Sequence, residues 1–534
     1  MFRIVSVDRT QSIHEPPNLA EAENADQPTC AQLASLFLST ITNWRTQMTG
    51  NTERACCAAP AAQPMARWLH ATARHSMAGV ERCIGCLAVV LMSACSTLPA
   101  IVPDMAPSAV AVQVDGARGP LSSKRSREIL ARLEQGGKTT NVFDRHLALE
   151  QAVSDSPLMA GNRVHLLEDG PLTYQAMFAA IKTARDHINL ETYILEADEV
   201  GQRFADALIE KQQQGVQVNL IYDSVGTLAT PAAFVARMRE SGISTLEFNP
   251  VNPLTAKAGW DVNGRDHRKL LIIDGKSAFL GGINISSVYS GGSFSTHSKV
   301  RPGGSLPWRD THLQIDGPVV AEFQKLFVET WQKQKGEPLA PRNYFPTLQP
   351  QGNEVVRAIG SSPDEAFSQI YVTLISVINS AETEVLLTNA YFVPDPQLLA
   401  ALRDAVARGV DVRLMLPGST DSALVFHAGR SFYEQLLADG VKIFERRNAL
   451  MHSKTALIDG VWSTVGSTNL DWRSFLHNQE VNAVVLGTEF GARMRAAFER
   501  DVANAEQITL ESWRRRPIGL RVRELFSRLW QYWL

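Results

Sequence analysis

The sequence predicts an α/β fold of two similar lobes, each a parallel or mixed sheet flanked by helices, with a site at the pseudo-twofold seam between them. Three observations support this prediction. Strands and helices alternate regularly from Gly161 onward, the second half of the chain repeats the order of the first half, and one polar motif occurs once in each half. Regular alternation of this kind is typical of a sheet that helices cover on both faces.

In the first half, the pattern predicts strands over residues 163–167, 188–193, 216–222 and 244–248, and helices over 174–184, 203–213 and 234–241. In the second half, it predicts helices over 367–380, 397–408 and 433–439, and strands over 384–388, 410–416 and 441–444. Gly215 in QGVQVNL and Gly409 in RGVDVRL both join a helix end to an apolar strand, which marks an internal duplication. We expect the two lobes over residues 156–345 and 350–508, with their boundary in the Pro-rich stretch 338–352.

The polar motif reads H-x-K-x-x-x-x-D. It consists of His267, Lys269 and Asp274 in the first half, and of His452, Lys454 and Asp459 in the second. In each copy an asparagine follows seventeen positions after the histidine, Asn284 in GGIN and Asn469 in GSTN. Two copies with matched downstream residues are very unlikely to arise by chance at ordinary residue frequencies.

The local pattern indicates what these residues can do. Histidine and lysine two positions apart lie on one face of a strand, and an apolar run and an Asp-Gly turn follow them. Histidine supplies a nucleophile or a proton-transfer group, lysine a point charge for phosphate, and asparagine neutral donors. A lone histidine of this kind is more often a hydrogen-bonded core residue, but the duplication favours two half-sites that face each other across one phosphorus atom.

These motifs resemble those of the phospholipase D superfamily. In the second half, the segments YFVPD at 391–395, SFYE at 431–434 and GSTNLDWRSF at 466–475 are similar to the bacterial cardiolipin synthase branch, and the resemblance covers roughly residues 155–520. It implies a phosphatidyltransferase that makes cardiolipin from phosphatidylglycerol, or with phosphatidylethanolamine as donor, through a phosphohistidine intermediate. It also implies that His267 is the nucleophile and His452 the general acid and base, a choice that spacing alone does not make.

The remaining site residues follow from this resemblance and from the chemistry. Lys269, Lys454, Asn284, Asn469 and Ser467 are the candidate phosphate ligands, so the reaction needs no metal and no cofactor. Glu480 stands where the family carries a carboxylate that orients a histidine, and Asp310 is its expected counterpart in the first half. Asp274 and Asp459 complete the catalytic motifs but close them at turns, so we interpret them as structural residues and not as proton donors.

Two other functions use the same residues. A phospholipase D hydrolase or a phosphodiesterase of the nuclease type needs the same site, and the sequence does not decide between water and an alcohol as acceptor. A net charge of -3 and the lack of a basic aromatic groove argue against a nucleic-acid partner. The two complete motifs argue against a catalytically silent scaffold.

The first 94 residues predict an upstream extension and a lipoprotein-type signal segment. All six cysteines lie within the first 95 residues, and the apolar run 83–94 is short, follows three arginines and ends at Cys95. We expect lipidation of Cys95, translation from Met65 or Met77, and a location at the periplasmic face of the envelope. The alternative is a buried or interfacial helix, and Cys83 and Cys86 lack the second pair that a zinc site requires.

Three further segments flank or interrupt the lobes. Residues 95–155 predict an extended tether and two lead-in helices, over 126–134 and 144–153, that pack on the first lobe. A Gly/Ser-rich insertion at 286–307 is either a lip over the site or a plain surface loop. In the tail 512–534, an apolar stripe and an opposite arginine-rich face predict a helix that lies on an anionic membrane or docks on the protein. The tail residues concerned are Arg514, Arg515, Arg516, Arg521, Arg523 and Arg528, with Val522, Leu525, Phe526, Leu529, Trp530 and Trp533.

Overall fold

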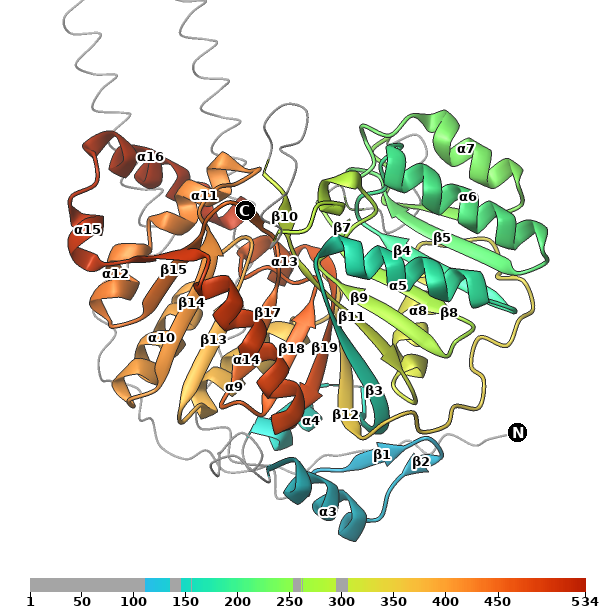
Figure 1. Ribbon diagram of the computed structural model, residues 1–534, viewed down its shortest axis with the longest axis horizontal. Helices are drawn as coiled ribbons and strands as arrows, with labels where there is room; N and C mark the ends of the chain where they lie inside the picture. Colours follow the sequence, from blue (N-terminus) through green and yellow to red (C-terminus); the bar gives the residue numbers. More distant parts are fainter. Residues whose placement is uncertain (1–110, 135–145, 155, 253–260, 262, 294–305) are drawn as a thin grey trace, which may run out of the picture. The chain divides into compact units, whose positions relative to one another are not determined.

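The computed structural model describes residues 111–134, 146–154, 156–252, 261, 263–293 and 306–534 (Figure 1). The expected signal segment, Cys95, and most of the Gly/Ser-rich insertion lie outside the described residues. Among the described residues, no helix is both long and apolar enough to cross a bilayer.

The first lobe is a seven-stranded mixed sheet with the order β6-β5-β4-β8-β9-β11-β3. β4, β5 and β6 are parallel to one another, and the other neighbours in the sheet are antiparallel. The strands are β3 (Leu158–Glu168), β4 (His187–Thr192), β5 (Gln217–Asp223), β6 (Ser244–Phe248), β8 (Lys269–Ile273), β9 (Ser277–Gly281) and β11 (Thr311–Asp316). The helices are α5 (Asp169–Thr183), α6 (Glu199–Gln213), α7 (Ala232–Glu240) and α8 (Val320–Lys333).

The second lobe repeats this sheet with the order β15-β14-β13-β17-β18-β19-β12 and the same strand directions. Because the seven strands correspond one to one, the structure confirms the predicted duplication. The strands are β12 (Glu354–Ser361), β13 (Glu384–Thr388), β14 (Asp411–Pro417), β15 (Lys442–Arg446), β17 (Thr455–Ile458), β18 (Trp462–Gly466) and β19 (Asn478–Leu486). The helices are α9 (Gln369–Ser380), α10 (Pro396–Ala407), α11 (Ala423–Arg430), α12 (Tyr433–Ala438), α13 (Trp472–Leu476) and α14 (Thr488–Val502).

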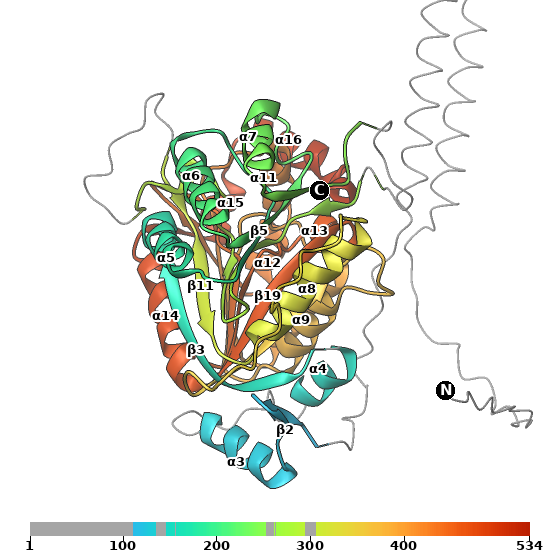
Figure 2. The same cartoon turned by 90° about the vertical axis from the view of Figure 1, so that its right-hand side faces the viewer.

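The two sheets join at β3 and β12, which pair antiparallel. Each side of the joined sheets carries helices from both lobes, α5 with α14 on one side and α8 with α9 on the other (Figure 2). The strand β8 shows why its sequence is apolar throughout. Leu270 and Ile272 pack in a cluster with α8 and α14, whereas Leu271 and Ile273 pack in a cluster with α5 and α6.

The motif aspartates hold turns at the far end of these strands. Asp274 and Asp459 adopt φ angles of 52° and 51° and are each followed by a glycine with positive φ. The Asp274 carboxylate accepts N–H bonds from the backbone at residues 185–187, and Asp459 accepts the equivalent bonds at residues 382–384. Both aspartates therefore fix the entry into the strands β4 and β13, as structural residues do.

Two short parallel pairings connect the lobes near the motif histidines. β7 (Arg265–Asp266) pairs with the start of β19 in the other lobe, and β10 (Trp308–Arg309) pairs with β16 (Leu450–Met451). The two pairings are related by the pseudo-twofold axis. In each pairing one strand ends directly before a motif histidine, β7 before His267 and β16 before His452. They hold the two motifs at the same edge of the joined sheets (Figure 1).

The lead-in segment differs from the prediction. From residue 111 the chain is not an extended tether, because β1 (Val114–Gly116) and β2 (Gly119–Pro120) form a hairpin and β1 pairs parallel with β3. α3 (Ser123–Glu134) and α4 (Leu147–Val153) follow, and their buried apolar residues belong to the core of the second lobe. The prediction that these helices pack on the first lobe is therefore wrong.

The reason for this docking is a buried ionic group. Glu150 of α4 is fully buried and lies 3.2 Å from the guanidinium of Arg357 on β12. His146 Nε2 lies 2.8 Å from Glu150, and Trp462 also donates to this carboxylate. A buried carboxylate needs such partners, and the second lobe provides two of them, Arg357 and Trp462.

The tail forms α15 (Leu510–Arg514), α16 (Ile518–Arg528) and the short helix η4 (Gln531–Trp533). α16 packs on α11 through the face that carries Glu524 and Ser527, which are buried. The apolar stripe of Ile518, Val522, Leu525, Phe526 and Leu529 lies on the opposite face, and each of these residues is more than half exposed. The prediction that arginines form the face opposite the stripe is wrong, because that face is the docking surface. At 100° per residue, Arg521, Arg523 and Arg528 flank the stripe instead, and the other three arginines precede α16.

Candidate active site

His267 and His452 are held by the opposite lobe through the same backbone contact. The His267 N–H donates to the Gln479 carbonyl at 3.0 Å, and the His452 N–H donates to the Arg309 carbonyl at 2.8 Å. Gln479 directly precedes Glu480 in the sequence, and Arg309 directly precedes Asp310. The backbone pairing therefore places a carboxylate of one lobe beside the imidazole of the other.

Glu480 is the carboxylate beside His267. Its two oxygens lie 3.0 and 3.1 Å from His267 Nδ1, and it also accepts bonds from the Ser467 hydroxyl and from Asn478 Nδ2. Burial would raise the pKa of Glu480, but the charge and hydrogen bond of His267, with help from Lys269 and Ser467, hold this pKa well below its usual value. An ionised Glu480 accepts the Nδ1 proton, so Nε2 of His267 is the nitrogen left for chemistry.

Asp310 is the carboxylate beside His452, at 2.7 Å from Nδ1. A Cβ atom at Gly282 would come within 2.2 Å of the Asp310 carboxylate, so this position of the GGIN segment has to be glycine. Gly282 corresponds to Ser467 in the second lobe. The shorter Asp310 thus fits against a glycine, while the longer Glu480 is supported by a serine hydroxyl.

Lys269 and Lys454 contact the backbone of the two motif histidines. Each ammonium donates to the backbone carbonyl of its own motif histidine, and both side chains are buried. Burial lowers the pKa of Lys269 to about 7 and that of Lys454 to about 8. The charge of Lys454 is among the causes that lower the pKa of Lys269 and of His267, so the two motifs lie close to each other.

The histidine side chains are almost enclosed, with 10% of His267 and 7% of His452 exposed. Burial is the main cause that lowers the pKa of His267, to about 4, and Lys269 and Lys454 lower it further while Glu480 raises it. Burial and Lys454 likewise lower the pKa of His452. His267 is therefore a neutral imidazole at neutral pH.

The other predicted phosphate ligands, Asn284, Ser467 and Asn469, differ in whether their side chains already have hydrogen-bond partners within the protein. Asn284 is committed within the protein, because its Oδ1 accepts from the Ile194 N–H and its Nδ2 donates to the Tyr289 hydroxyl. The Ser467 hydroxyl donates a hydrogen bond to Glu480 and so stabilises this carboxylate. Asn469 is buried, and its Oδ1 has no hydrogen-bond partner within the described residues.

Aromatic side chains that the sequence analysis did not assign surround the two imidazoles. Tyr193 lies edge-on to His267, with 5.1 Å between ring centroids, and Trp308 lies 4.9 Å from His452. The Tyr289 hydroxyl is 3.4 Å from His452 Nδ1. Tyr391 is also edge-on to His452, and it lies in the YFVPD segment that carried the family resemblance. The others had no sequence signal, since each stands outside a motif.

Buried arginines fix the segments that carry these residues. Arg309 pairs with Asp501 of α14 through Nε at 2.9 Å and through a second nitrogen at 2.9 Å. Arg268, next to His267, donates to the Glu480 carbonyl at 3.0 Å and to the Thr330 hydroxyl at 2.9 Å. These bonds tie each motif to the other lobe and to the flanking helices.

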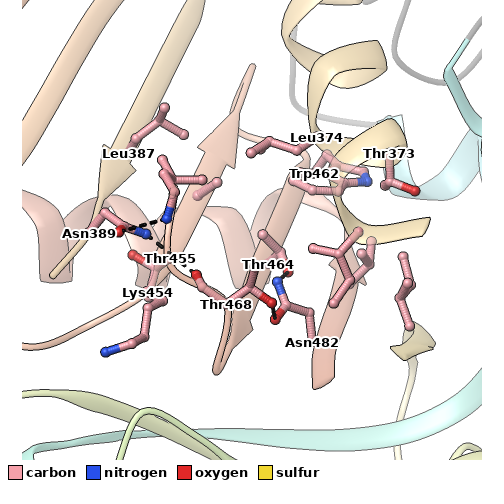
Figure 3. Close-up of a pocket in the computed structure, with 15 residues that line it drawn as sticks. Thr373, Leu374, Leu387, Asn389, Lys454, Thr455, Trp462, Thr464, Thr468 and Asn482 are labelled. Carbon is pink, nitrogen blue, oxygen red and sulfur yellow. Dashed lines mark hydrogen bonds between the residues drawn. The ribbon is translucent and has the colours of Figure 1, made fainter. Parts of the chain in front are cut away.

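A small cavity lies behind Lys454, between the strands of the second lobe and α9 (Figure 3). Its volume is about 30 Å³, which suits one or two water molecules and not a lipid headgroup or an acyl chain. In Figure 3 the Lys454 ammonium points away from Trp462 and Thr373, the residues at the other end of this cavity. The cavity is therefore not the substrate site.

The geometry has the components of a phosphoryl-transfer site. Two imidazoles, each oriented by a carboxylate through Nδ1, share a buried site with two cations. One imidazole can attack phosphorus while the other protonates the leaving oxygen, and the lysines can stabilise the negative charge on the non-bridging oxygens.

Comparisons with known proteins agree with this geometry. The family described as "Cardiolipin synthase, PLD-like domain" matches residues 177–290 and 374–502, one segment in each lobe. The cardiolipin synthase of Geobacillus kaustophilus is 36% identical over 386 residues, which cover 72% of this chain and 74% of the relative. Cardiolipin synthase A of Pseudomonas fluorescens is 34% identical over 379 residues, which cover 70% and 76%. The crystal structure of phosphatidylserine synthase from Haemophilus influenzae has the same fold, with a TM-score of 0.55 at 13% identity, over 73% of this chain and all of that one.

Replacement of either orienting carboxylate tests the carboxylate–histidine pairs. Because Glu480→Gln or Asp310→Asn removes the negative acceptor of the Nδ1 proton, we expect kcat for a phosphodiester substrate to fall about 10³-fold. The protein should remain folded, which the thermal midpoint will show. Glu506→Gln, an exposed carboxylate on β20 (Ala505–Ile508), is the matched control and should keep full activity. Full activity in both site variants would contradict the assignment.

The lowered lysine pKa values predict how anion binding depends on pH. Sulfate is a dianion throughout, whereas Lys269 and Lys454 lose their charge as the pH rises through about 7 and about 8. We therefore expect the affinity for sulfate, measured by calorimetry, to fall at least about tenfold between pH 7 and pH 9. Lys269→Met should leave only the smaller dependence that Lys454 causes, and Lys333→Met, on the surface of α8, should keep the full dependence. An unchanged affinity over this range would show that the buried lysines do not bind the anion.

Proposed function

The chain belongs to the cardiolipin synthase family of the phospholipase D superfamily, and we propose that its two histidines carry out the phosphatidyl transfer that forms cardiolipin. The observation that supports this mechanism is the reciprocal arrangement of the motifs. Each imidazole is oriented through Nδ1 by a carboxylate from the other lobe. Each motif lysine is buried and donates to the backbone carbonyl of its own histidine.

In the first step, His267 Nε2 attacks the phosphorus atom of a donor phospholipid. The new N–P bond forms as the bond from phosphorus to the headgroup oxygen breaks, and His452 gives this oxygen its proton. The low pKa of His267, caused mainly by burial, keeps the imidazole neutral and nucleophilic. Glu480 stabilises the positive charge that His267 gains in the phosphohistidine.

In the second step, the hydroxyl of the acceptor lipid gives its proton to His452 as its oxygen bonds to phosphorus. The N–P bond to His267 breaks, and the enzyme returns to its starting state. Lys269 and Lys454 neutralise the non-bridging oxygens in both steps, and the Nδ2 group of the buried Asn469 can donate a further hydrogen bond to them. The protein's own groups thus supply the charge and the proton that each step requires.

The substrates are membrane phospholipids, with phosphatidylglycerol as acceptor and either phosphatidylglycerol or phosphatidylethanolamine as donor. The two donors differ only in the alcohol that leaves, so the same two histidines serve both. Water at the acceptor position would give phosphatidate instead of cardiolipin.

Lipid analysis after expression in a bacterial strain without cardiolipin tests the mechanism. We expect the wild-type chain to restore cardiolipin, and His267→Ala and His452→Ala to lower its formation by about 10³-fold or more, because each removes a group that both steps need. His165→Ala, at an exposed position on β3, is the matched control and should restore cardiolipin. Cardiolipin that persists in both site variants would remove the proposal. A labelled phosphopeptide containing His452 would reverse the assignment of the nucleophile.

Membrane association follows from the family, and we propose that two features of the chain bring it about. The first is the exposed apolar stripe of α16 with arginines at its flanks, which suits the headgroup layer of an anionic membrane. The second is lipidation of Cys95, which would hold the chain at the periplasmic face and rests on the sequence alone. Two signals of moderate strength together anchor a protein more firmly than either does.

Substitutions in α16 test the membrane surface. A deletion of the tail would disturb the site, because Tyr532 packs on Trp472 at 4.7 Å and the Leu534 carbonyl accepts the Arg473 N–H. We therefore choose Leu525→Gln, Phe526→Gln and Leu529→Gln together. Each buried apolar side chain contributes about 1.5–3 kcal/mol, so affinity for anionic vesicles should fall about 100-fold or more.

The matched control replaces two exposed apolar residues elsewhere, Leu172→Gln and Phe345→Gln, and should bind as the wild type does. In cells, Cys95→Ser combined with the α16 substitutions should release the protein from the membrane fraction more fully than either change alone. Unaltered vesicle binding of the α16 variant would show that the stripe does not meet the membrane.

A further inference from the structure

The two histidines have equivalent carboxylate contacts, but the aromatic and charged side chains around them differ. On the His452 side, the Tyr391 ring stands edge-on to the imidazole, with centroids 6.4 Å apart and planes at 90°. The Tyr391 hydroxyl donates to Asp421 Oδ2 at 2.7 Å. Asp421 lies in the loop between β14 and α11, and it is exposed.

Asp421 is close enough to act on the proposed acid and base. Burial is the main cause that lowers the pKa of His452 and of Lys454, and the negative charge of Asp421 is among the causes that oppose this lowering for both groups. A chain of contacts therefore leads from the exposed Asp421 carboxylate through the Tyr391 side chain to the His452 ring.

The His267 side has the opposite character. The carboxylate near Tyr193 is Asp223, which is fully buried and committed to Arg265 and to the N–H groups of Val225 and Gly226. The positive charges of Arg473 and Arg265 act on Tyr193 and oppose the rise of its pKa that burial causes. The carboxylate near Tyr193 is thus buried and paired with an arginine, whereas the carboxylate near Tyr391 is exposed, although the two motifs are equivalent.

We propose that Asp421 and Tyr391 bind a hydroxyl-bearing lipid headgroup, a glycerol, beside His452. The inference rests on the proposed function, because the alcohol that leaves in the first step and the alcohol that arrives in the second both meet phosphorus on the His452 side. When one glycerol hydroxyl donates to His452, a neighbouring hydroxyl can donate to the Asp421 carboxylate. Water has no second hydroxyl and gains nothing from this contact, so the pair favours transfer over hydrolysis.

The bonds in this step balance without a further reagent. The acceptor O–H bond breaks, its proton goes to His452 Nε2, the O–P bond forms, and the N–P bond to His267 breaks. Asp421 and Tyr391 keep their protonation and supply only hydrogen bonds. They position the attacking hydroxyl, and they touch the substrate at an atom that does not react.

The loop that carries Asp421 also connects this rim to the membrane surface. It runs directly into α11, and α11 is the helix on which α16 docks (Figure 1). Arg430 at the end of α11 holds it by two bonds to the buried Glu445, at 3.0 and 3.1 Å. The proposed membrane surface on α16 and the loop that carries Asp421 are therefore connected through one helix, α11.

The test uses the full chain on vesicles and two donors, phosphatidylglycerol and a phospholipid with a nitrophenyl headgroup that lacks a hydroxyl. The measurements are the release of each headgroup and the ratio of cardiolipin to phosphatidate. For Asp421→Asn, we expect a loss of about tenfold or more that is specific to glycerol. If the acceptor is the glycerol that binds, the product ratio falls. If the leaving group binds there, glycerol release falls tenfold more than nitrophenol release.

Tyr391→Phe keeps the ring on His452 and removes only the hydroxyl, so it should show the same specificity with a smaller loss. It also keeps the test decisive if Asp421→Asn does not fold. Asp404→Asn, an exposed carboxylate on α10, is the matched control and should leave both measurements at the wild-type value. Equal losses with both donors at an unchanged product ratio would overturn the proposal, as would no change in any measurement.

Failure of the proposed function gives a different result. In that case the wild-type chain itself would release headgroups and form phosphatidate without cardiolipin at every content of phosphatidylglycerol.

Discussion

Each catalytic histidine depends on a carboxylate that the other lobe supplies, and this exchange is the constraint on which the rest of the structure depends. The exchange rests on backbone geometry, since β7 pairs with β19 and β10 pairs with β16 just before each histidine and each carboxylate. Neither lobe can therefore form a complete half-site alone. The buried pair of Arg309 and Asp501 has the same consequence, because removing one partner would leave an uncompensated charge in the seam.

The sequence predicted the architecture well where the pattern is local. The strands expected over 244–248 and 384–388 have these same bounds in the structure, and the two motifs lie close enough for the charge of Lys454 to act on His267 and Lys269. Asp310 was found only by analogy with Glu480, because an insertion separates it from its motif. The strands β9 and β11 and the helix α8 were not predicted, although the two strands are needed to complete the first sheet.

Other features could not be predicted, because they depend on partners far away in the sequence. α4 docks on the second lobe since Glu150 needs Arg357, two residues that no periodicity connects. The arginines of α16 flank its apolar stripe, because the burial of Glu524 and Ser527 decides which face meets the protein. Similarly, Ser467 and Asn284 belong to the motifs, but their side chains support Glu480 and Tyr289 rather than the open site.

The pseudo-symmetry is broken where the chemistry requires two different roles. The frame gives each imidazole the same carboxylate contact through Nδ1, so the frame alone cannot make one a nucleophile and the other an acid. The surroundings differ, however. Burial and two lysines keep the pKa of His267 at about 4, which leaves the imidazole neutral and ready to attack.

His452 has two carboxylates near it, Asp310 in contact and Asp421 at the rim, and both favour its protonated form. An acid that has to give a proton in one step and take one in the next needs this support. Duplication therefore explains how the site is built, and the unequal surroundings support the proposed division of roles, in which one half attacks phosphorus and the other transfers the proton.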